Sequence, residues 1–261
     1  MSLYKQIKEK FNEYNPTVDM LKVVYGIESN ADYDAIIVAP SWKPEKIFKN
    51  FNALITVTCE GPYFCGYEVN VNSKKYGYIQ TASGAGNMID CCLILGNAKC
   101  NNIIFIGAVG ALCSDINLGD IVTSKYSIAG DGGSLYLYEK ITTENYRKRV
   151  YPDPKCQEKI RSVSKKLNIP IKEKVIYCTD TIFGEYYHLD DIKQMGSELI
   201  EMETASFLRC MELIQKQGLV LLCVSDNSAS GHALVGRSEE HTKLFHEARE
   251  IKIPKLIMGL S

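Results

Sequence analysis

Two glutamates separated by one methionine, Glu201-Met202-Glu203, end a short apolar run and precede a segment with helical spacing. Such a run predicts a strand, so the two carboxylates lie where a strand gives way to a helix. Burying two carboxylates together is unfavourable unless each has a partner. The arrangement is understandable if one carboxylate accepts hydrogen bonds from hydroxyl groups of a ligand.

A glycine-rich turn gives a second place where a ligand can approach the chain. Residues 102–112 predict a strand that runs into a Gly-x-x-Gly turn, with Gly107 and Gly110 as its glycines. Glycines let the backbone pass close to a ligand and present its N–H groups. The turn alone is also common as a purely structural feature of α/β proteins. Gly119-Asp120 follows nine residues after Gly110, and this continuation makes the pattern more specific.

Three further motifs accompany these two. A glycine-rich strand-to-helix turn lies at 80–87, Thr179-Asp180-Thr181-Ile182-Phe183 follows an apolar run, and Ser225-Asp226 ends another. Together with the Glu-Met-Glu segment, the five motifs resemble, in the same order, those of the nucleoside phosphorylase superfamily. This superfamily includes purine nucleoside and uridine phosphorylases and methylthioadenosine nucleosidases, which cleave the bond between a sugar and a base. The resemblance covers about Ala35 to Asp226, which is most of the chain.

The resemblance implies roles for the acids. Glu203 matches the carboxylate that binds the ribose 2′- and 3′-hydroxyls, and an ionised carboxylate can accept from both at once. Asp226 matches the acid that donates a proton to purine N7 as the base departs, which requires a raised pKa. The alternative for Asp226 is a helix cap or a turn acid. Glu201 is interpreted as a solvated or salt-bridged neighbour.

Apolar residues are implied around the sugar and the base. Met202 matches the methionine that packs under the sugar, with a core side chain as the alternative. Ile182 and Phe183 match the apolar wall of the base pocket, although the Phe183 ring is displaced by one position from the phenylalanine of the family. Arg237 lies eleven residues after Asp226 and is either the arginine that settles the general acid or a surface charge.

The sequence departs from the family where phosphate binds. A phosphorylase holds phosphate with arginines, which give bidentate and permanently charged contacts. Glu45 stands at or near one expected arginine, Phe105 stands at the second, and Ala108 replaces a serine or threonine. Losing several charge-assisted hydrogen bonds, each about 1.5–3 kcal/mol, predicts weak phosphate binding. Lys43 or Lys46 is a possible substitute.

Water is the alternative to phosphate as the acceptor of the sugar. The hydrolytic branch of the superfamily places a glutamate after the first strand, where it activates water, and Glu45 is a candidate for that base. A solvated acid at the start of a helix is the other interpretation of Glu45. The phosphate or water site is predicted around Gly107, Ala108 and Ser41, with inorganic phosphate as a possible co-substrate and with no metal or organic cofactor.

Short apolar runs must position these residues. They predict strands at Ala35–Val38, Leu54–Thr58, Tyr76–Thr81, Ile103–Ile106, Asp120–Thr123, Val175–Cys178, Leu199–Met202 and Leu219–Val224. Several runs are apolar throughout, as expected of strands covered on both faces.

Helical spacing lies between some of these runs. It predicts helices near the N-terminus and at Asn87–Asn97, Asp153–Leu167, Thr204–Lys216 (with Gly218 as a stop) and Ser238–Glu250, the last of the chain. The alternation indicates an α/β protein, a three-layer α/β/α fold with a central mixed sheet, in one domain over residues 1–261.

Bulk composition excludes several classes of protein. The chain has 261 residues, a net charge of −1 and 46% apolar residues, so it offers no electrostatic footprint for nucleic acid or an anionic membrane. No apolar run reaches the ~20 residues that span a bilayer. Ten cysteines without a CxxC pair, a zinc-like grouping or a secretory leader indicate reduced thiols and a cytoplasmic location.

The prediction for function is N-glycosidic cleavage of a nucleoside, with a purine favoured. Phosphorolysis with an atypical phosphate site comes first, a nucleosidase that uses water is the close alternative, and a nucleoside-binding protein without catalysis is the third. The resemblance also implies a homo-oligomer, a dimer or a hexamer, because enzymes of this family complete the pocket with a residue from a neighbouring subunit.

Overall fold

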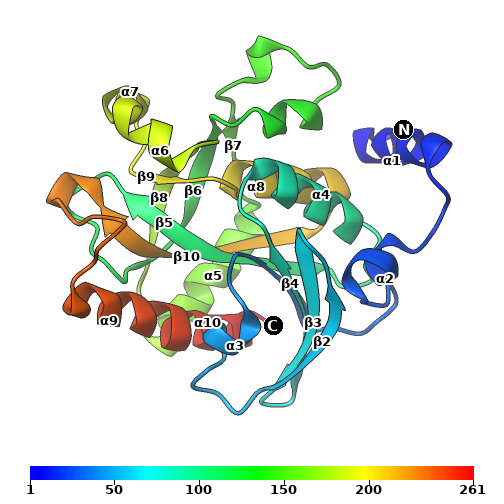
Figure 1. Cartoon of the computed structure of the whole chain (residues 1–261), viewed down its shortest axis with the longest axis horizontal. Helices are drawn as coiled ribbons and strands as arrows, with labels where there is room; N and C mark the ends of the chain where they lie inside the picture. Colours follow the sequence, from blue (N-terminus) through cyan, green and yellow to red (C-terminus); the bar gives the residue numbers. More distant parts are fainter.

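The computed structural model describes residues 1–261 and contains one sheet of ten strands. The strand order is β10-β6-β8-β9-β5-β1-β4-β3-β2, with β7 beside β6. An additional pairing of β10 with β5 closes β5, β10, β6, β8 and β9 into a ring, and β1, β4, β3 and β2 extend from it (Figure 1). Most of the candidate residues lie on the strands of this ring or shortly after them, whereas Ser41 and Glu45 follow β1, outside the ring.

The strands alternate with helices along most of the chain. The strands are β1 (Ala35–Pro40), β2 (Leu54–Glu60), β3 (Phe64–Val71), β4 (Lys74–Thr81), β5 (Asn102–Ala111), β6 (Ile121–Ala129), β7 (Arg149–Val150), β8 (Ile171–Cys178), β9 (Leu199–Glu201) and β10 (Gln217–Asn227). The helices are α1 (Leu3–Tyr14), α2 (Met20–Tyr25), α3 (Pro44–Ile47), α4 (Ala85–Leu95), α5 (Pro154–Leu167), α6 (Ile182–Glu185), α7 (Leu189–Gln194), α8 (Thr204–Ile214), α9 (Glu239–Glu247) and α10 (Ile253–Leu260).

Helices cover both faces of the sheet, which confirms the predicted mixed sheet between helical layers. Side chains of α2, α4 and α8 pack on one face, in a core that includes Leu21, Met88 and Phe207. Side chains of α3, α5 and α10 pack on the other face, in a core that includes Ile160 and Leu256. The central strand β1 is buried at all six positions and pairs in parallel with β4 and β5, as its uniform apolarity predicts.

Two strands were not predicted from the sequence. β3 alternates between buried and half-buried positions and pairs with β2 and β4 in antiparallel fashion. Polar residues interrupt the apolar residues of β3, so the search for continuous apolar runs did not identify this strand. β7 has only two residues. The neighbouring β2, predicted as a strand, is an edge strand with a largely exposed surface, unlike the strands that are covered on both faces.

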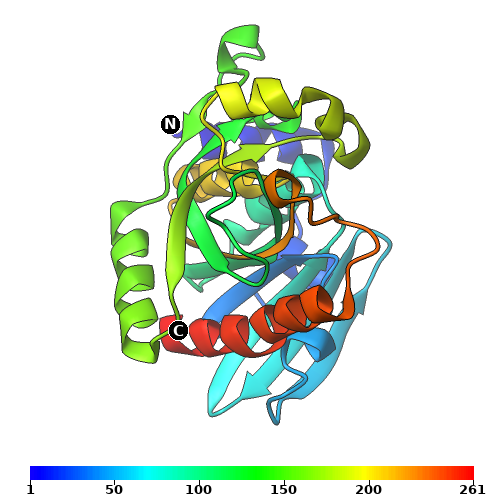
Figure 2. The ribbon, with the colours of Figure 1, turned by 90° about the vertical axis from the view of Figure 1, so that its left-hand side faces the viewer.

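The predicted ends of two helices need correction. α8 ends at Gln215, which adopts a left-handed conformation, and Gly218 belongs to β10 instead of stopping the helix. A Cβ atom at Gly218 would lie 2.5 Å from the Met211 side chain, so close packing explains this glycine. The helix predicted to be the last, α9, is followed by a π-helical turn and by α10, which together form one rod along the sheet (Figure 2).

None of the helices is both long enough and apolar enough to cross a membrane.

Candidate active site

A cavity of about 200 Å³ lies at the ends of β1, β5, β9 and β10, where these strands meet α6 and the N-terminus of α8. Adjacent ends of strands in an α/β sheet are a common place for ligands. Seven of the predicted residues line this cavity: Ser41, Gly107, Ala108, Ile182, Met202, Glu203 and Asp226. Residues that are up to 185 positions apart in sequence are thereby brought together by the order of the strands.

Glu203 lines the cavity where β9 passes into α8. We call this part of the lining the sugar end, after the role that the family resemblance implies for Glu203. The side chain is 6% exposed, and Oε1 accepts a hydrogen bond of 2.5 Å from the backbone N–H of Gly84. Burial, followed by the nearby charge of Glu201, raises the pKa of Glu203 to about 8. A carboxyl group that makes only one hydrogen bond to the protein can still form hydrogen bonds with hydroxyl groups of a ligand, whether it is ionised or protonated.

Gly84 begins α4 and must be a glycine for conformational reasons. Its φ of +104° lies in a region that residues with a Cβ atom rarely adopt. This conformation turns its N–H toward Glu203 across 119 residues of sequence. The glycine-rich motif at 80–87 therefore connects α4 to the carboxylate at the sugar end.

Glu201 is buried and structural, so its interpretation as a solvated or salt-bridged neighbour is wrong. Its carboxylate accepts from the backbone N–H groups of Glu203 and Thr204 at 2.8 Å each and from the thiol of Cys178 at 2.8 Å. It thus supplies acceptors to N–H groups at the start of α8 that have no partner within the helix. Burial raises its pKa, and these hydrogen bonds oppose that rise.

Asp226 lines the same cavity from the end of β10. We call this part of the lining the base end, after the role that the family resemblance implies for Asp226. It is 8% exposed, and Oδ1 accepts a hydrogen bond of 2.5 Å from the hydroxyl of Ser225. The register of β10 shifts between Val224 and Asp226, a bulge that redirects side chains at a strand end. Burial raises the pKa of Asp226, with Ser225 and then Arg237 acting in the opposite direction.

Gly110 makes room for that carboxyl. A Cβ atom at Gly110 would lie 2.9 Å from Oδ2 of Asp226 and 3.3 Å from Ile200. The second glycine of the Gly-x-x-Gly turn is therefore explained by the close approach of Asp226.

Glu185 is a further acid of the base end, and it was not singled out from the sequence. It is half-buried at the end of α6 and lines the same cavity. Burial, together with the charge of Asp226, raises its pKa to about 7. Glu185 lies five residues after Asp180, in the segment that follows the base-pocket motif. This position was the sequence signal that could have identified it.

The predicted apolar wall is only partly present. Ile182 lines the cavity and is 49% exposed, whereas Phe183 is 94% exposed and lies outside the cavity lining. The Phe183 prediction is not supported by this chain alone. Successive residues of a helix point about 100° apart, so a helix that turns Ile182 inward directs Phe183 to solvent.

The loop after β1 does not bring a cation or a base into the cavity. Glu45, Lys43 and Lys46 are exposed on or beside α3, and none of them lines the cavity. The Glu45 prediction is therefore not supported by the geometry. From this loop the cavity receives Ser41, whose hydroxyl lies 3.0 Å from that of Ser83, and Trp42.

The other positions expected to bind phosphate are also uncharged. Phe105 is buried and packs against Phe207 with ring centroids 5.3 Å apart, so it belongs to the core. Ala108 lines the cavity and offers only its backbone. The 17 lining residues include four acids, Glu185, Glu201, Glu203 and Asp226, and no lysine, arginine or histidine.

Arg237 lies near the site without lining it. Its guanidinium stacks 4.7 Å from the ring centroid of Phe245, and its Nε has no hydrogen-bond partner. The positive charge of Arg237 lowers the pKa of Asp226, although no hydrogen bond joins the two side chains. Which of the two interpretations of Arg237 holds, the arginine that settles the general acid or a surface charge, stays a prediction.

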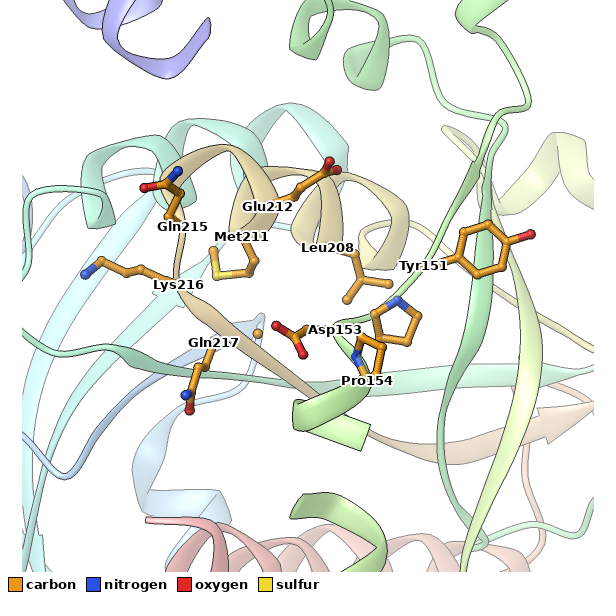
Figure 3. Close-up of a pocket in the computed structure, with 11 residues that line it drawn as sticks. Tyr151, Asp153, Pro154, Leu208, Met211, Glu212, Gln215, Lys216 and Gln217 are labelled. Atoms are coloured by element: carbon orange, nitrogen blue, oxygen red, sulfur yellow. The ribbon is translucent and has the colours of Figure 1, made fainter. Parts of the chain in front are cut away.

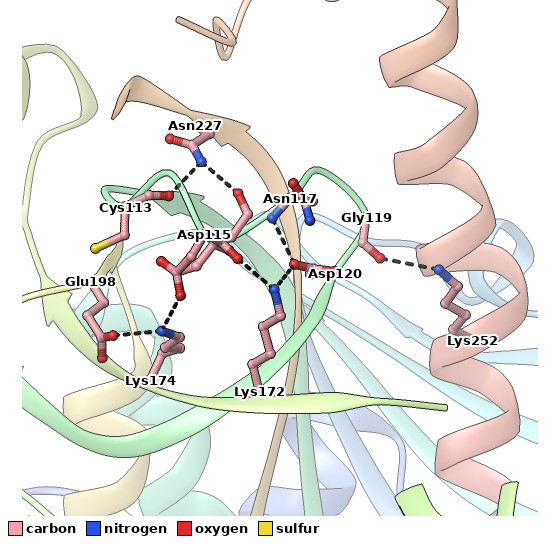
Figure 4. Close-up of polar contacts among 11 residues, drawn as sticks. Cys113, Asp115, Asn117, Gly119, Asp120, Lys172, Lys174, Glu198, Asn227 and Lys252 are labelled. Atoms are coloured by element: carbon pink, nitrogen blue, oxygen red, sulfur yellow. Dashed lines mark hydrogen bonds and ion pairs between the residues drawn. The ribbon is translucent and has the colours of Figure 1, made fainter. Parts of the chain in front are cut away.

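The loop between β5 and β6 is held by the polar contacts that Figure 4 shows. The side chain of Asn227, next to Asp226, donates to the carbonyl oxygens of Cys113 at 2.9 Å and Ile116 at 2.7 Å. Asp120 accepts from Asn117 N–H and from Lys172, both at 2.7 Å. The Gly-Asp motif thus has a supporting role, because it fixes the loop on which the end of β10 rests.

A larger cavity of about 490 Å³ lies at the start of β10, opposite to the end that carries Asp226 (Figure 3). The three charged side chains that line it already have partners within the protein. Asp153 caps α5, Glu212 pairs with Arg209 at 2.6 Å, and Lys216 donates to the carbonyl oxygens of Ala98 and Cys100. It contains none of the predicted site residues.

Comparisons with known proteins agree with this geometry. A sequence model of the phosphorylase superfamily matches residues 82–255. A purine nucleoside phosphorylase of the DeoD type from Aliivibrio salmonicida is 25% identical over 217 residues, which are 81% of this chain and 87% of that protein.

Solved structures show the same fold. The crystal structure of uridine phosphorylase from Vibrio fischeri superposes with a TM-score of 0.71 at 15% identity, covering 87% of this chain and 91% of that one. The 5′-methylthioadenosine/S-adenosyl homocysteine nucleosidase of Campylobacter jejuni gives 0.65 at 14% identity, with 87% and 98% covered.

Proposed function

The chain belongs to the phosphorylase superfamily, and from that premise we propose that it cleaves the N-glycosidic bond of a purine nucleoside. One observation carries the proposal: Glu203 and Met202 line the same cavity as Asp226, a cavity of about 200 Å³. The preference for a purine is supported by Asp226, a buried acid with a raised pKa, and by the DeoD-type relatives.

The proposed mechanism divides the work between the two ends. Cleavage builds positive charge on the sugar ring and negative charge on the leaving base. Glu203 binds the ribose hydroxyls, and its carboxyl and that of Glu201 favour the positive sugar. Asp226 donates a proton to N7 of the base, which is why a raised pKa serves the reaction.

Water is the acceptor that the geometry of this chain supports best. No lysine, arginine or histidine lines the cavity, so a phosphate dianion meets no compensating positive charge there. The hydroxyls of Ser41 and Ser83 are polar groups suited to hold a water molecule in the cavity. The water oxygen bonds to C1′ as the N-glycosidic bond breaks, and the proton that water loses returns through solvent to Asp226, replacing the one given to the base. With Glu45 exposed and outside the cavity, the proposal does not rely on it as a base.

Phosphorolysis is the second candidate, and the names of the relatives favour it. It requires that cations reach the cavity from outside its present lining, from Lys43, Lys46 or a neighbouring copy. The reaction as proposed needs only the nucleoside and either water or inorganic phosphate.

The experiment is to incubate the protein with adenosine, inosine, uridine and methylthioadenosine, each with and without phosphate, and to follow base release. Free ribose without phosphate supports hydrolysis. Strictly phosphate-dependent release of ribose 1-phosphate, saturating at ~micromolar phosphate, would overturn hydrolysis and support the second candidate. Binding of nucleosides without base release under any condition indicates a protein that has lost catalysis.

We also propose that the protein forms a homo-oligomer, a dimer or a hexamer, and that residues 1–261 make one domain. The support is the family resemblance and an exposed apolar patch beside the base end, formed by Ile182, Phe183, Tyr186 and Tyr187. Replacing Phe183 by serine is expected to weaken self-association in sedimentation while leaving the unfolding temperature of the monomer unchanged. Unaltered association would argue against this patch.

Ten unpaired cysteines support a cytoplasmic location.

A further inference from the structure

The four acids of the cavity differ in how far the protein already satisfies them. Glu201 accepts from two backbone N–H groups and a thiol, Glu203 accepts from Gly84, and Asp226 accepts from Ser225. Glu185 has no donor from the protein, and only burial and the charge of Asp226 act on it. A half-buried carboxyl that lines a cavity and has no partner is available to a ligand.

The position of Glu185 indicates which part of a ligand it meets. It shares the base end with Asp226, which is close enough for its charge to act on Glu185. In a purine, the group at C6 is the neighbour of N7 on the same edge of the ring. Adenine presents an amino donor there, and a 6-oxopurine presents an oxygen acceptor. If Asp226 faces N7, the adjacent acid faces the group at C6.

Resting on the proposed function, we propose that Glu185 selects the base by its contact with the group at purine C6. The ionised carboxylate accepts from a 6-amino group and repels the lone pairs of a 6-oxo group. The protonated carboxyl reverses this, because it can donate to the 6-oxo oxygen. The base preference therefore changes with the protonation state of one side chain, and no covalent step is involved.

The protonation of Glu185 changes in the neutral range, since its pKa is raised to about 7. The charge of Asp226 on β10 acts on Glu185. Burial, and then the charges of Asp226 and Glu185, raise the pKa of the neighbouring Tyr186 hydroxyl. Arg237 acts on Asp226. Titration of Asp226 affects proton donation to N7 in both kinds of purine. The ratio of kcat/KM for the two substrates therefore isolates the contribution of Glu185.

The test compares kcat/KM for adenosine and inosine at about pH 6 and about pH 8. The fraction of ionised carboxylate rises about tenfold between these values for a group titrating near 7. We expect the adenosine-to-inosine ratio to rise about tenfold or more with pH in the wild type. In Glu185→Gln the ratio should be flat, because an amide both donates and accepts at every pH. Asp190→Asn, an exposed acid on α7, is the matched control and should keep the wild-type profile.

The single tryptophan gives a second readout that does not depend on turnover. Trp42 lines the cavity, so its fluorescence can follow binding of free adenine and free hypoxanthine at the two pH values. If both nucleosides are cleaved and the adenosine-to-inosine ratio of kcat/KM does not change with pH, the role of Glu185 is overturned and the proposed function is retained. A pH-dependent base preference in binding with no cleavage overturns the function and supports Glu185. A pH-dependent ratio that persists in Glu185→Gln assigns it to Asp226 and overturns the inference.

Discussion

The two ends of the cavity are built differently. At the sugar end, Glu203 is held by the N–H of Gly84, and Glu201 beneath it accepts from the start of α8. At the base end, Asp226 has one partner, Ser225, and Glu185 has none. The base end also rests on α6, a helix of four residues without a buried side chain.

This difference follows from what each end must recognise. Every ribonucleoside presents the same pair of 2′- and 3′-hydroxyls, so a carboxyl group held by a backbone N–H suits all of them. Bases differ in their donors and acceptors, and a site for them needs groups with free hydrogen-bonding capacity. A rigid sugar end and an adaptable base end can therefore evolve separately on the same set of strands.

The largest effect is expected at the fixed end. Glu203→Ala should lower kcat/KM by about 10²–10⁴-fold, because it removes a charged contact to the sugar. The unfolding temperature should remain close to that of the wild type, since the side chain has one hydrogen bond to the protein. Steady-state kinetics with thermal unfolding as the control measure both. A variant with near-wild-type kcat/KM would mean that the sugar does not bind at this end.

A similar but more specific loss is expected at the base end. Asp226→Asn should reduce kcat by about 10²-fold with little change in KM, because an amide cannot supply the proton to N7. A purely structural Asp226 would instead give a lower unfolding temperature and ordinary kinetics per folded molecule. The ratio of the kcat loss to the KM change separates these cases.

The pH dependence of stability also distinguishes the two ends. The pKa of Glu203 is raised to about 8 in the fold, so the native state holds a proton that the unfolded chain releases. The free energy of unfolding of the ligand-free protein should therefore fall as pH rises from about 4.5 to about 8, by on the order of 3 kcal/mol. In Glu203→Gln this contribution should be absent, and denaturant titrations at several pH values measure it. An unchanged slope in that variant would assign the effect to other acids.

The positions of Glu203 and Met202 in the cavity lining could be predicted better than those of Phe183 and Glu185, for physical reasons. Glu203 and Met202 follow a continuous apolar strand, so both local pattern and motif fix their positions. Phe183 and Glu185 lie on a short exposed helix, where the direction of each side chain depends on where one helical turn begins. The motif gave their neighbourhood and could not give their orientation.

Long-range geometry was the other part that local patterns missed. The ring formed by β5, β10, β6, β8 and β9 depends on pairing between distant segments, and no local pattern encodes it. The burial of Glu201 likewise depends on Cys178 from β8, a neighbour that only the folded sheet supplies. The mixed sheet itself was predictable, because uniform apolar strands alternate with amphipathic helices over most of the chain.

The smallest effect we predict tests whether the sugar end is fixed by the backbone. Gly84→Ala should lower kcat/KM about tenfold, because a φ of +104° is strained for alanine and the N–H that holds Glu203 must turn away. No atom lies within 4 Å of the new Cβ, so steric crowding is not the cause. Gly86→Ala is the matched control: it lies two residues on in α4, also in open space and without a positive φ, and alanine should stabilise that helix by up to about 1 kcal/mol. Equal activity of the two variants would show that Glu203 keeps its position without Gly84, and the contrast between a fixed and an adaptable end would then rest on Glu201 alone.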